Sequence, residues 1–310
     1  MKLLSIGTVA FDALETPFGK RDKIVGGSCT YIALSASYFL NKSGIVSVVG
    51  DDFPQDMIQK LESRNIDLDG LQIKEGEKTF FWSGRYHNDM NTRDTLDTQL
   101  NVLENFDPII PESQKNAEYV MLGNLVPALQ NQVMDRLGNK PKFTMLDTMN
   151  LWMEVALDDL KKVIARVDLL TINDEEARLL SGEYSLRKAA KVIMAMGPKF
   201  LIIKKGEHGA LLFGEDEIFY APALPLEEVF DPTGAGDTFA GGFIGHLAAT
   251  GDLSWENMKN AIIMGSAMAS FTVEKFGIER LRDLTMEEIA DRINEFAELT
   301  NFSLEFPAVV

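Results

Sequence analysis

The chain has 310 residues, 45% of them hydrophobic, which is enough to bury one large core. Its 47 acidic and 30 basic side chains give a formal net charge of -17. This charge argues against a nucleic-acid partner, because such partners are bound by clustered lysines and arginines. The sequence shows no signal-like leading segment and no apolar stretch long enough to cross a membrane. A single cysteine, Cys29, excludes an internal disulfide, and we expect a cytoplasmic protein without a membrane partner.

The first hundred residues predict one buried strand and a small sheet. Residues 3–6 are apolar and predict the strand. Residues 78–100 place aromatic side chains around turn-forming Asn and Asp residues, which predicts a hairpin of two short strands. With residues 11–14 and 20–25, this hairpin is expected to form a separate sheet, with segments at approximately 10–25 and 71–100.

From about residue 116 onward, strand-length apolar runs alternate with segments of helical period. The predicted strands are 119–122, 143–146, 167–172 and 200–203, and the predicted helices are 128–137, 152–165 and 174–195, the last broken near Gly182. This alternation predicts an α/β fold, a doubly wound and mostly parallel sheet with helices on both faces. We expect residues 1–310 to form a single domain.

Polar residues follow several of these strands. Asp147 and Asn150 follow the second, Asn173 follows the third, and Lys205 with Gly206 follows the fourth. Because ligands of open α/β sheets bind outside the carboxyl ends of the strands, we expect these residues near the ligand.

The segment DPTGAGDT, residues 231–238, carries the most chemical information. Gly234 and Gly236 allow the backbone to turn sharply at the start of a helix, where unpaired N–H groups attract an anion. Asp237 places a carboxylate beside that anion, which suits a base that takes a proton from an attacking hydroxyl. Taken alone, the segment also fits a strand-to-helix turn whose Asp only caps the helix.

The segment DPTGAGDTFAGGF resembles the C-terminal signature of the ribokinase-like, or PfkB, carbohydrate kinases. Four further segments resemble this family and occur in its order. They are the early strand with Asp12 and Gly26-Gly27, VVGDDF at 48–53, Asn173 with Glu176 in TINDEEARLLSG, and KGEHG at 205–209. The resemblance implies an ATP-dependent kinase that phosphorylates a hydroxyl, typically a primary alcohol, of a small sugar. The alternatives are a nucleoside (adenosine-like) kinase of the same fold and a non-catalytic ATP-binding homologue.

The resemblance also implies roles for individual residues. Asp237 is the expected base, and the N–H groups of Gly234, Ala235 and Gly236, which we call the anion-hole turn, are expected to stabilise the transferring phosphoryl group. The expected acceptor-binding residues are Asp12, Gly26, Gly27, Tyr31 and Asn150. The expected nucleotide-binding residues are Asn173, Lys205, Gly206 and Gly209. Glu176 is expected to bind Mg2+, directly or through water, and Asp231 and Thr233 match positions that bind a monovalent cation such as K+. In this family the small sheet is a lid over the acceptor, and in some members it forms a homodimer contact.

Several of these assignments have alternatives in the sequence. Asn173 can cap a helix while Glu176 stays solvated, and Asp231 can cap a turn before Pro232. Tyr31 stands near the position of a sugar-binding asparagine of the family, so it could stack on a nucleobase or simply pack the lid. A phosphorylated sugar would require cations in the lid, where Arg85 and Arg93 are the candidates.

Overall fold

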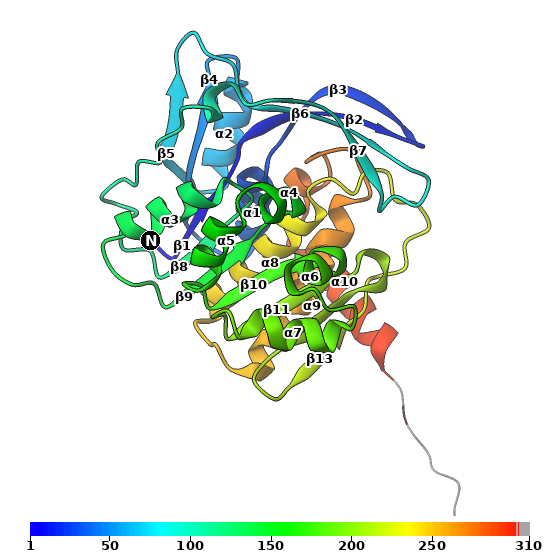
Figure 1. The fold of residues 1–310 in the computed structure, drawn as a ribbon. Helices are drawn as coiled ribbons and strands as arrows, with labels where there is room; N and C mark the ends of the chain where they lie inside the picture. Colours follow the sequence, from blue (N-terminus) through cyan, green and yellow to red (C-terminus); the bar gives the residue numbers. More distant parts are fainter. Residues whose placement is uncertain (302, 304–310) are drawn as a thin grey trace, which may run out of the picture.

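The computed structural model describes residues 1–301 and 303 (Figure 1). It contains a nine-stranded sheet and a separate four-stranded sheet. In spatial order, the large sheet consists of β13 (Ile218–Ala221), β12 (Ala210–Phe213), β11 (Phe200–Lys204), β10 (Leu169–Asn173), β9 (Phe143–Asp147), β8 (Tyr119–Leu122), β1 (Leu3–Ile6), β4 (Ser43–Gly50) and β5 (Ile66–Lys74). All pairs from β5 to β11 are parallel, whereas β12 and β13 are antiparallel.

Helices cover both faces of the large sheet. One face packs against α3 (Pro127–Arg136), α4 (Asn150–Val155), α5 (Leu157–Ile164), α6 (Asp174–Ser181) and α7 (Leu186–Met194). The other packs against α1 (Ser28–Ala36), α2 (Gln55–Ser63), α8 (Ala235–Thr250) and α9 (Trp255–Thr272), with α10 (Met286–Thr300) outside α9. Neighbouring strand residues such as Leu3 and Leu4 point into opposite cores, as the period of two requires. The predicted doubly wound fold is therefore confirmed.

The predicted helical segments differ in detail from the observed helices. The expected break near Gly182 is confirmed, because Gly182 ends α6 in the left-handed conformation (φ 72°). The segment predicted as one helix over 152–165 is instead two helices, α4 and α5, which meet at Ala156. Among the described residues, no helix combines the length and the apolar character needed to cross a bilayer.

The four-stranded sheet is the lid expected from the sequence. Its strands, in spatial order, are β3 (Gly19–Gly26), β2 (Ala10–Thr16), β6 (Phe81–Tyr86) and β7 (Arg93–Gln99). It arches over the carboxyl ends of the large sheet's strands (Figure 1). Residues 71–74 of the expected lid range lie in β5 of the large sheet, so the second lid segment begins later than the sequence indicated.

Helix α8, which follows the anion-hole turn, packs closely between α1 and α9. A Cβ on Gly241 would come within 2.4 Å of Ile32 O in α1, and one on Gly242 within 3.1 Å of the Gly265 Cα in α9. Larger side chains at these positions would force the helices apart. The glycines of FAGGF thus fix α8, and with it the turn at its start, against its neighbours.

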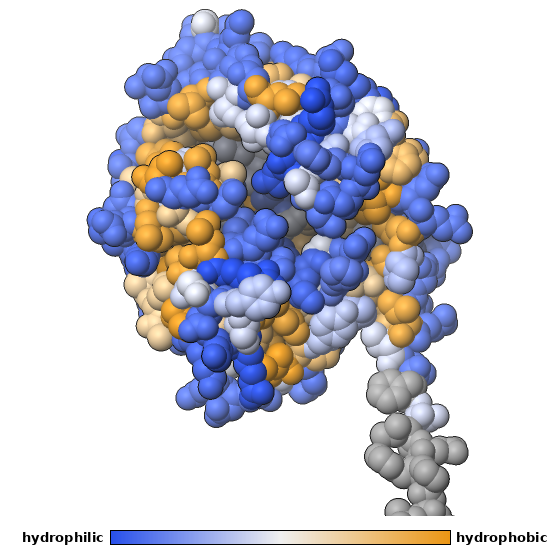
Figure 2. Space-filling model, turned by 45° about the vertical axis from the view of Figure 1, so that its right-hand side comes forward, coloured by the Kyte–Doolittle hydropathy of each residue, from blue (hydrophilic) through white to orange (hydrophobic). Residues whose placement is uncertain are grey.

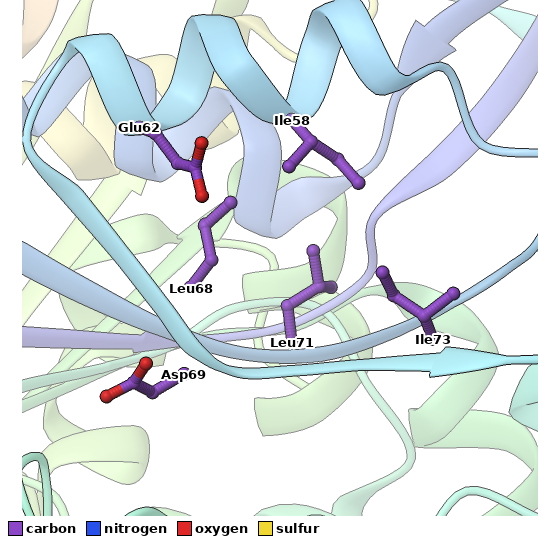
Figure 3. Close-up of a pocket in the computed structure, with 6 residues that line it drawn as sticks. All are labelled: Ile58, Glu62, Leu68, Asp69, Leu71 and Ile73. Atoms are coloured by element: carbon purple, nitrogen blue, oxygen red, sulfur yellow. The ribbon is translucent and has the colours of Figure 1, made fainter.

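A shallow surface pocket of about 240 Å³ lies between α2 and β5, at the edge of the large sheet (Figure 3). It is lined by Ile58, Glu62, Leu68, Asp69, Leu71 and Ile73. None of the candidate site residues lines it, so it does not belong to the site described next.

Candidate active site

The anion-hole turn is built as the sequence suggested. Gly234 is the N-cap of α8 and has a left-handed backbone (φ 75°), which favours glycine. No side chain caps the first turn of α8, so its N–H groups are suited to an anion. Of the three expected donors, Ala235 already donates its N–H to Pro232 O at 3.2 Å. Gly234 and Gly236 are therefore the better donors for a phosphoryl group.

Asp237 lies in the first turn of α8 among other charged side chains. Burial raises the pKa of its carboxyl to about 7, and the negative charge of Asp147 adds to the rise. Lys204 and Arg93 oppose the rise through their positive charges. A carboxylate whose pKa is near neutrality can accept a proton from a hydroxyl and release it again.

Three neighbouring parallel strands end beside this turn with polar residues. Asp147 ends β9, Asn173 ends β10 and Lys204 ends β11. The Lys204 Nζ lies 3.1 and 3.3 Å from the two carboxylate oxygens of Asp147. The expectation that polar residues gather at this edge of the sheet is confirmed for Asp147 and Asn173, whereas Lys204 was not recognised from the sequence.

Asn173 and Glu176 form a reciprocal cap at the start of α6. The Asn173 side chain accepts the Glu176 N–H, and a Glu176 carboxylate oxygen accepts the Asn173 N–H, both at 2.8 Å. Glu176 is only 7% exposed, so the solvated alternative for it is wrong, whereas the capping alternative for Asn173 is confirmed. Burial raises the pKa of Glu176 to about 7, against the nearby positive charge of Lys204.

Glu176 is a carboxylate suited to Mg2+ that is shared with a bound nucleotide. Among the described residues, no cluster of three or more His, Cys, Asp or Glu side chains could hold a metal ion. Mg2+ in phosphoryl-transfer enzymes is typically held by one or two carboxylates together with substrate phosphates. Glu176 fits that pattern, because one of its oxygens is bonded to Asn173 and the other has no hydrogen bond to the described part of the chain.

The expected nucleotide-side turn connects β11 and β12. Lys205 donates its backbone N–H to Gly209 O at 2.8 Å, which closes the turn over the short helix Gly206–His208. A Cβ on Gly209 would lie 2.1 Å from Ala221 O, so only glycine fits there. A Cβ on Gly206 would lie 2.5 Å from Asn91 Oδ1. The tip of the lid hairpin therefore touches the nucleotide-side turn.

The lid also reaches the anion-hole turn. The Thr233 hydroxyl lies 3.2 Å from the Tyr86 hydroxyl of β6 and donates a hydrogen bond to it. The positive charge of Arg93 in β7 opposes the rise in the pKa of both Asp237 and Glu176. Arg85 instead pairs with Glu15 inside the lid, at 2.9 and 3.2 Å. Figure 2 shows a hollow in this side of the molecule with hydrophilic residues along much of its rim.

Asp12 lies on the acceptor side, on β2, and is 5% exposed. A Cβ on Gly26 would lie 1.9 Å from its Oδ2, so glycine leaves the space that the carboxylate occupies. Burial raises the pKa of Asp12 to about 8, Asp231 and Asp237 add to the rise, and the Gly27 N–H opposes it. The region around Asp12 thus gathers three carboxyl groups, and the charged form of Asp12 is disfavoured there.

Tyr31 packs beneath the anion-hole turn, not in the lid. It is 1% exposed, and a Cβ on Gly234 would lie 2.4 Å from its ring. Its hydroxyl is buried and has no hydrogen-bond partner in the described part of the chain. Because Tyr31 lies on α1, which packs along α8, its ring faces the turn and neither packs the lid nor offers a stacking surface for a nucleobase, the two alternatives considered for it.

Two further candidates have local partners. The buried carboxylate of Asp231 accepts the Thr233 N–H at 2.9 Å and the Gly277 N–H at 2.8 Å, as a turn cap would. Asn150, the first residue of α4, is exposed, and its side-chain oxygen accepts the Leu151 N–H at 3.0 Å.

The family model for pfkB family carbohydrate kinases matches residues 17–282. The chain belongs to this family. It is 33% identical to the cytidine kinase of Thermococcus kodakarensis over 250 residues, which cover 79% of this chain and 87% of the relative. It is 24% identical to the nucleoside kinase of Methanothermobacter thermautotrophicus over 306 residues, covering 89% and 91% of the two chains. An E. coli candidate ribokinase II, solved with ATP and Mg2+, covers 96% of this chain and 99% of its own at a TM-score of 0.77 and 19% identity.

The pfkB-family kinase is thus a phosphotransferase with an alcohol group as acceptor, and the acceptors of its family are sugars and nucleosides. The E. coli neighbour shows that a protein of this fold can hold ATP together with Mg2+. Membership in the family confirms the resemblance inferred from the sequence. The sequence did not reveal Lys204, Asn91 or Tyr86, because each becomes part of the site only through contacts between distant segments.

Proposed function

We propose that this kinase phosphorylates the primary hydroxyl of a nucleoside, with ATP as the donor and Asp237 as the base. The observation that carries the proposal is the buried carboxyl group of Asp12, which lies in reach of two other carboxyl groups and can accept hydrogen bonds from adjacent hydroxyls. Its charged neighbours, Asp231 and Asp237, are both acidic. Two relatives that align with most of the chain, a cytidine kinase and a nucleoside kinase, support the same acceptor class.

A neutral acceptor fits this region better than a phosphorylated sugar. A phosphate would enter a region with three buried carboxyl groups, Asp12, Asp231 and Asp237, whose charged forms burial already disfavours and a further negative charge would disfavour more. Of the two lid cations that could offset them, Arg85 is bonded to Glu15, whereas the charge of Arg93 acts on Asp237. The neighbouring hydroxyls of a ribose can instead donate two hydrogen bonds to the Asp12 carboxylate.

The proposed reaction is a direct transfer. The acceptor hydroxyl gives its proton to Asp237, and its oxygen forms a bond to the γ-phosphorus as the bond from that phosphorus to the bridging oxygen of ADP breaks. The products are ADP and the nucleoside monophosphate. The N–H groups of Gly234 and Gly236 stabilise charge on the transferring oxygens, and such donors are typically worth about 3 kcal/mol each.

The nucleotide side is assigned to the turn after β11 and the start of α6. We propose that Asn173, Lys205, Gly206 and Gly209 bind ATP, with Lys205 acting through its ammonium group. Bound Mg2+ would neutralise phosphate charge, and Glu176 would hold it directly or through water. Asn150 stays a proposed acceptor residue on the strength of its position after β9.

A monovalent-cation site at Asp231 and Thr233 is a separate proposal. Both Asp231 oxygens already accept an N–H group, which favours the capping role over ligation of K+. Turnover measured in K+ and then in tetramethylammonium would test it, because only a K+ site makes the rate depend on this exchange.

A homodimer through the lid is likewise proposed. Strand β7 forms one edge of the lid sheet and is exposed along its whole length, so its unpaired backbone groups could contact a second copy. Light scattering of the purified protein would test this, since a monomer at high concentration contradicts it.

The acceptor is tested by measuring ADP formation with a panel of cytidine, uridine, adenosine, inosine, ribose, fructose and fructose 6-phosphate. We expect turnover with at least one nucleoside at a kcat/KM well above that for any free sugar. Turnover with sugars or sugar phosphates but with none of the nucleosides would contradict the proposal.

A further inference from the structure

Lys204 and Asp147 form an ion pair directly beneath the first turn of α8. Their side chains are 19% and 8% exposed. A Cβ on Gly236 would lie 3.0 Å from the Lys204 Nζ, so the ammonium group sits against the second residue of the helix. The pair therefore borders the place where the anion-hole turn presents its N–H groups.

The stability of the fold does not explain such a pair. Removing two charges from water costs free energy that their attraction only partly returns, so buried ion pairs contribute little stability on balance. Burial lowers the pKa of Lys204, but Asp147, Glu176 and Asp237 more than offset this, and the pKa stays above its usual value. The side chain is thus held as a cation among three carboxyl groups.

The ammonium group also has bonding capacity left. A lysine ammonium donates three hydrogen bonds, and Asp147 receives two from Lys204. Lys204 and Arg93 are the cations that act on Asp237, and Arg93 belongs to the lid whereas Lys204 belongs to the large sheet. Lys204 is therefore in place whatever the position of the lid.

We propose that Lys204 is a further residue of the phosphoryl-transfer site, where its third N–H contacts an oxygen of the γ-phosphoryl group of ATP. Asp147 is then the positioning residue that fixes the ammonium group under the turn. Lys204 stays protonated and exchanges no proton in the reaction. The inference rests on the proposed position of the phosphates at the start of α8, but not on which acceptor the kinase uses.

The test compares Lys204→Met with Lys199→Met, a control at the other end of the β11 segment whose exposed side chain pairs with Asp168. Calorimetry in Mg2+ would give the affinity of each protein for ADP and for a non-hydrolysable ATP analogue. We expect Lys204→Met to lower the affinity for the ATP analogue by about 10- to 100-fold, as for a lost charged hydrogen bond, and to change the affinity for ADP little. Equal loss for both nucleotides, or no loss, would overturn the proposal.

A second comparison separates phosphate binding from neutralisation of Asp147. The double variant Lys204→Met with Asp147→Asn removes the buried carboxylate that the single variant leaves without its bonded partner, and so guards against a folding defect. If Lys204 binds phosphate, the double variant binds the ATP analogue as weakly as the single variant does. Recovery of the analogue's affinity in the double variant would show that Lys204 only balances Asp147. Both measurements need no acceptor, so they fail or succeed independently of the nucleoside proposal.

Discussion

The ring of Tyr31 lies against Gly234, where an added Cβ would come within 2.4 Å of the ring carbons. Gly234 also has a φ of 75°, which costs other residues about 1–2 kcal/mol. We therefore expect Gly234→Ala to lower the free energy of unfolding by more than this amount and to reduce kcat strongly. Chemical denaturation and steady-state kinetics would measure both effects.

Gly251 provides a matched control for that substitution. It ends the same helix with a φ of 70°, and an added Cβ there meets nothing within 4 Å. Gly251→Ala should therefore show the backbone cost alone and leave kcat unchanged. If the two variants lose equal stability and equal activity, the contact with Tyr31 does not constrain the turn.

The hydroxyl of Tyr31 is buried without a hydrogen-bond partner in the described part of the chain. Removing an unpaired buried polar group costs no bond and relieves its desolvation. Tyr31→Phe is therefore expected to be as stable as the unchanged protein or more stable, as thermal unfolding would measure. A clear loss of stability would mean that the hydroxyl has a partner in solution, such as a bound water.

Asp12 links the stability of the protein to pH. Its pKa rises from 3.8 to about 8 on folding, so the folded state binds more protons than the unfolded state between these values. The contribution of Asp12 to stability is fully present below about pH 4 and is lost as the pH rises through about 8. Asp12→Asn should thus raise the free energy of unfolding at pH 8 by about 1–3 kcal/mol while weakening acceptor binding. A variant that is less stable than the unchanged protein at pH 8 would contradict the sign of this linkage.

Arg93, a residue of the lid, should influence how turnover depends on pH. Its charge opposes the rise in the pKa of Asp237, which burial and Asp147 bring to about 7 even with Arg93 in place. Because the base must be ionised, kcat should rise with pH through about 7, and Arg93→Gln should move this rise to higher pH. Arg85→Gln is the control, since Arg85 pairs with Glu15 in the same sheet. An identical pH profile in Arg93→Gln and the unchanged protein would show that Arg93 does not act on the base.

The sequence predicted those features that depend on local chemistry. The turn at 231–238, the cap of α6 by Asn173 and the break at Gly182 each follow from residue types a few positions apart, whereas the burial of Glu176 and its bond to Asn173 were not predicted. Lys204 was missed because it and Lys205 are adjacent and both polar. Only the exact end of β11 decides that Lys204 points to Asp147 while Lys205 enters the turn. The contacts of Tyr31 and Asn91 were equally beyond the sequence, since each joins segments far apart in the chain.

The most direct test of the account is the rate of ADP formation with a nucleoside acceptor in the unchanged protein and in Asp237→Asn. Asparagine keeps the size of the side chain but cannot accept the proton, so we expect kcat to fall by about 10²- to 10⁴-fold while ATP still binds. Activity that survives in Asp237→Asn would contradict the proposed role of Asp237 as the base.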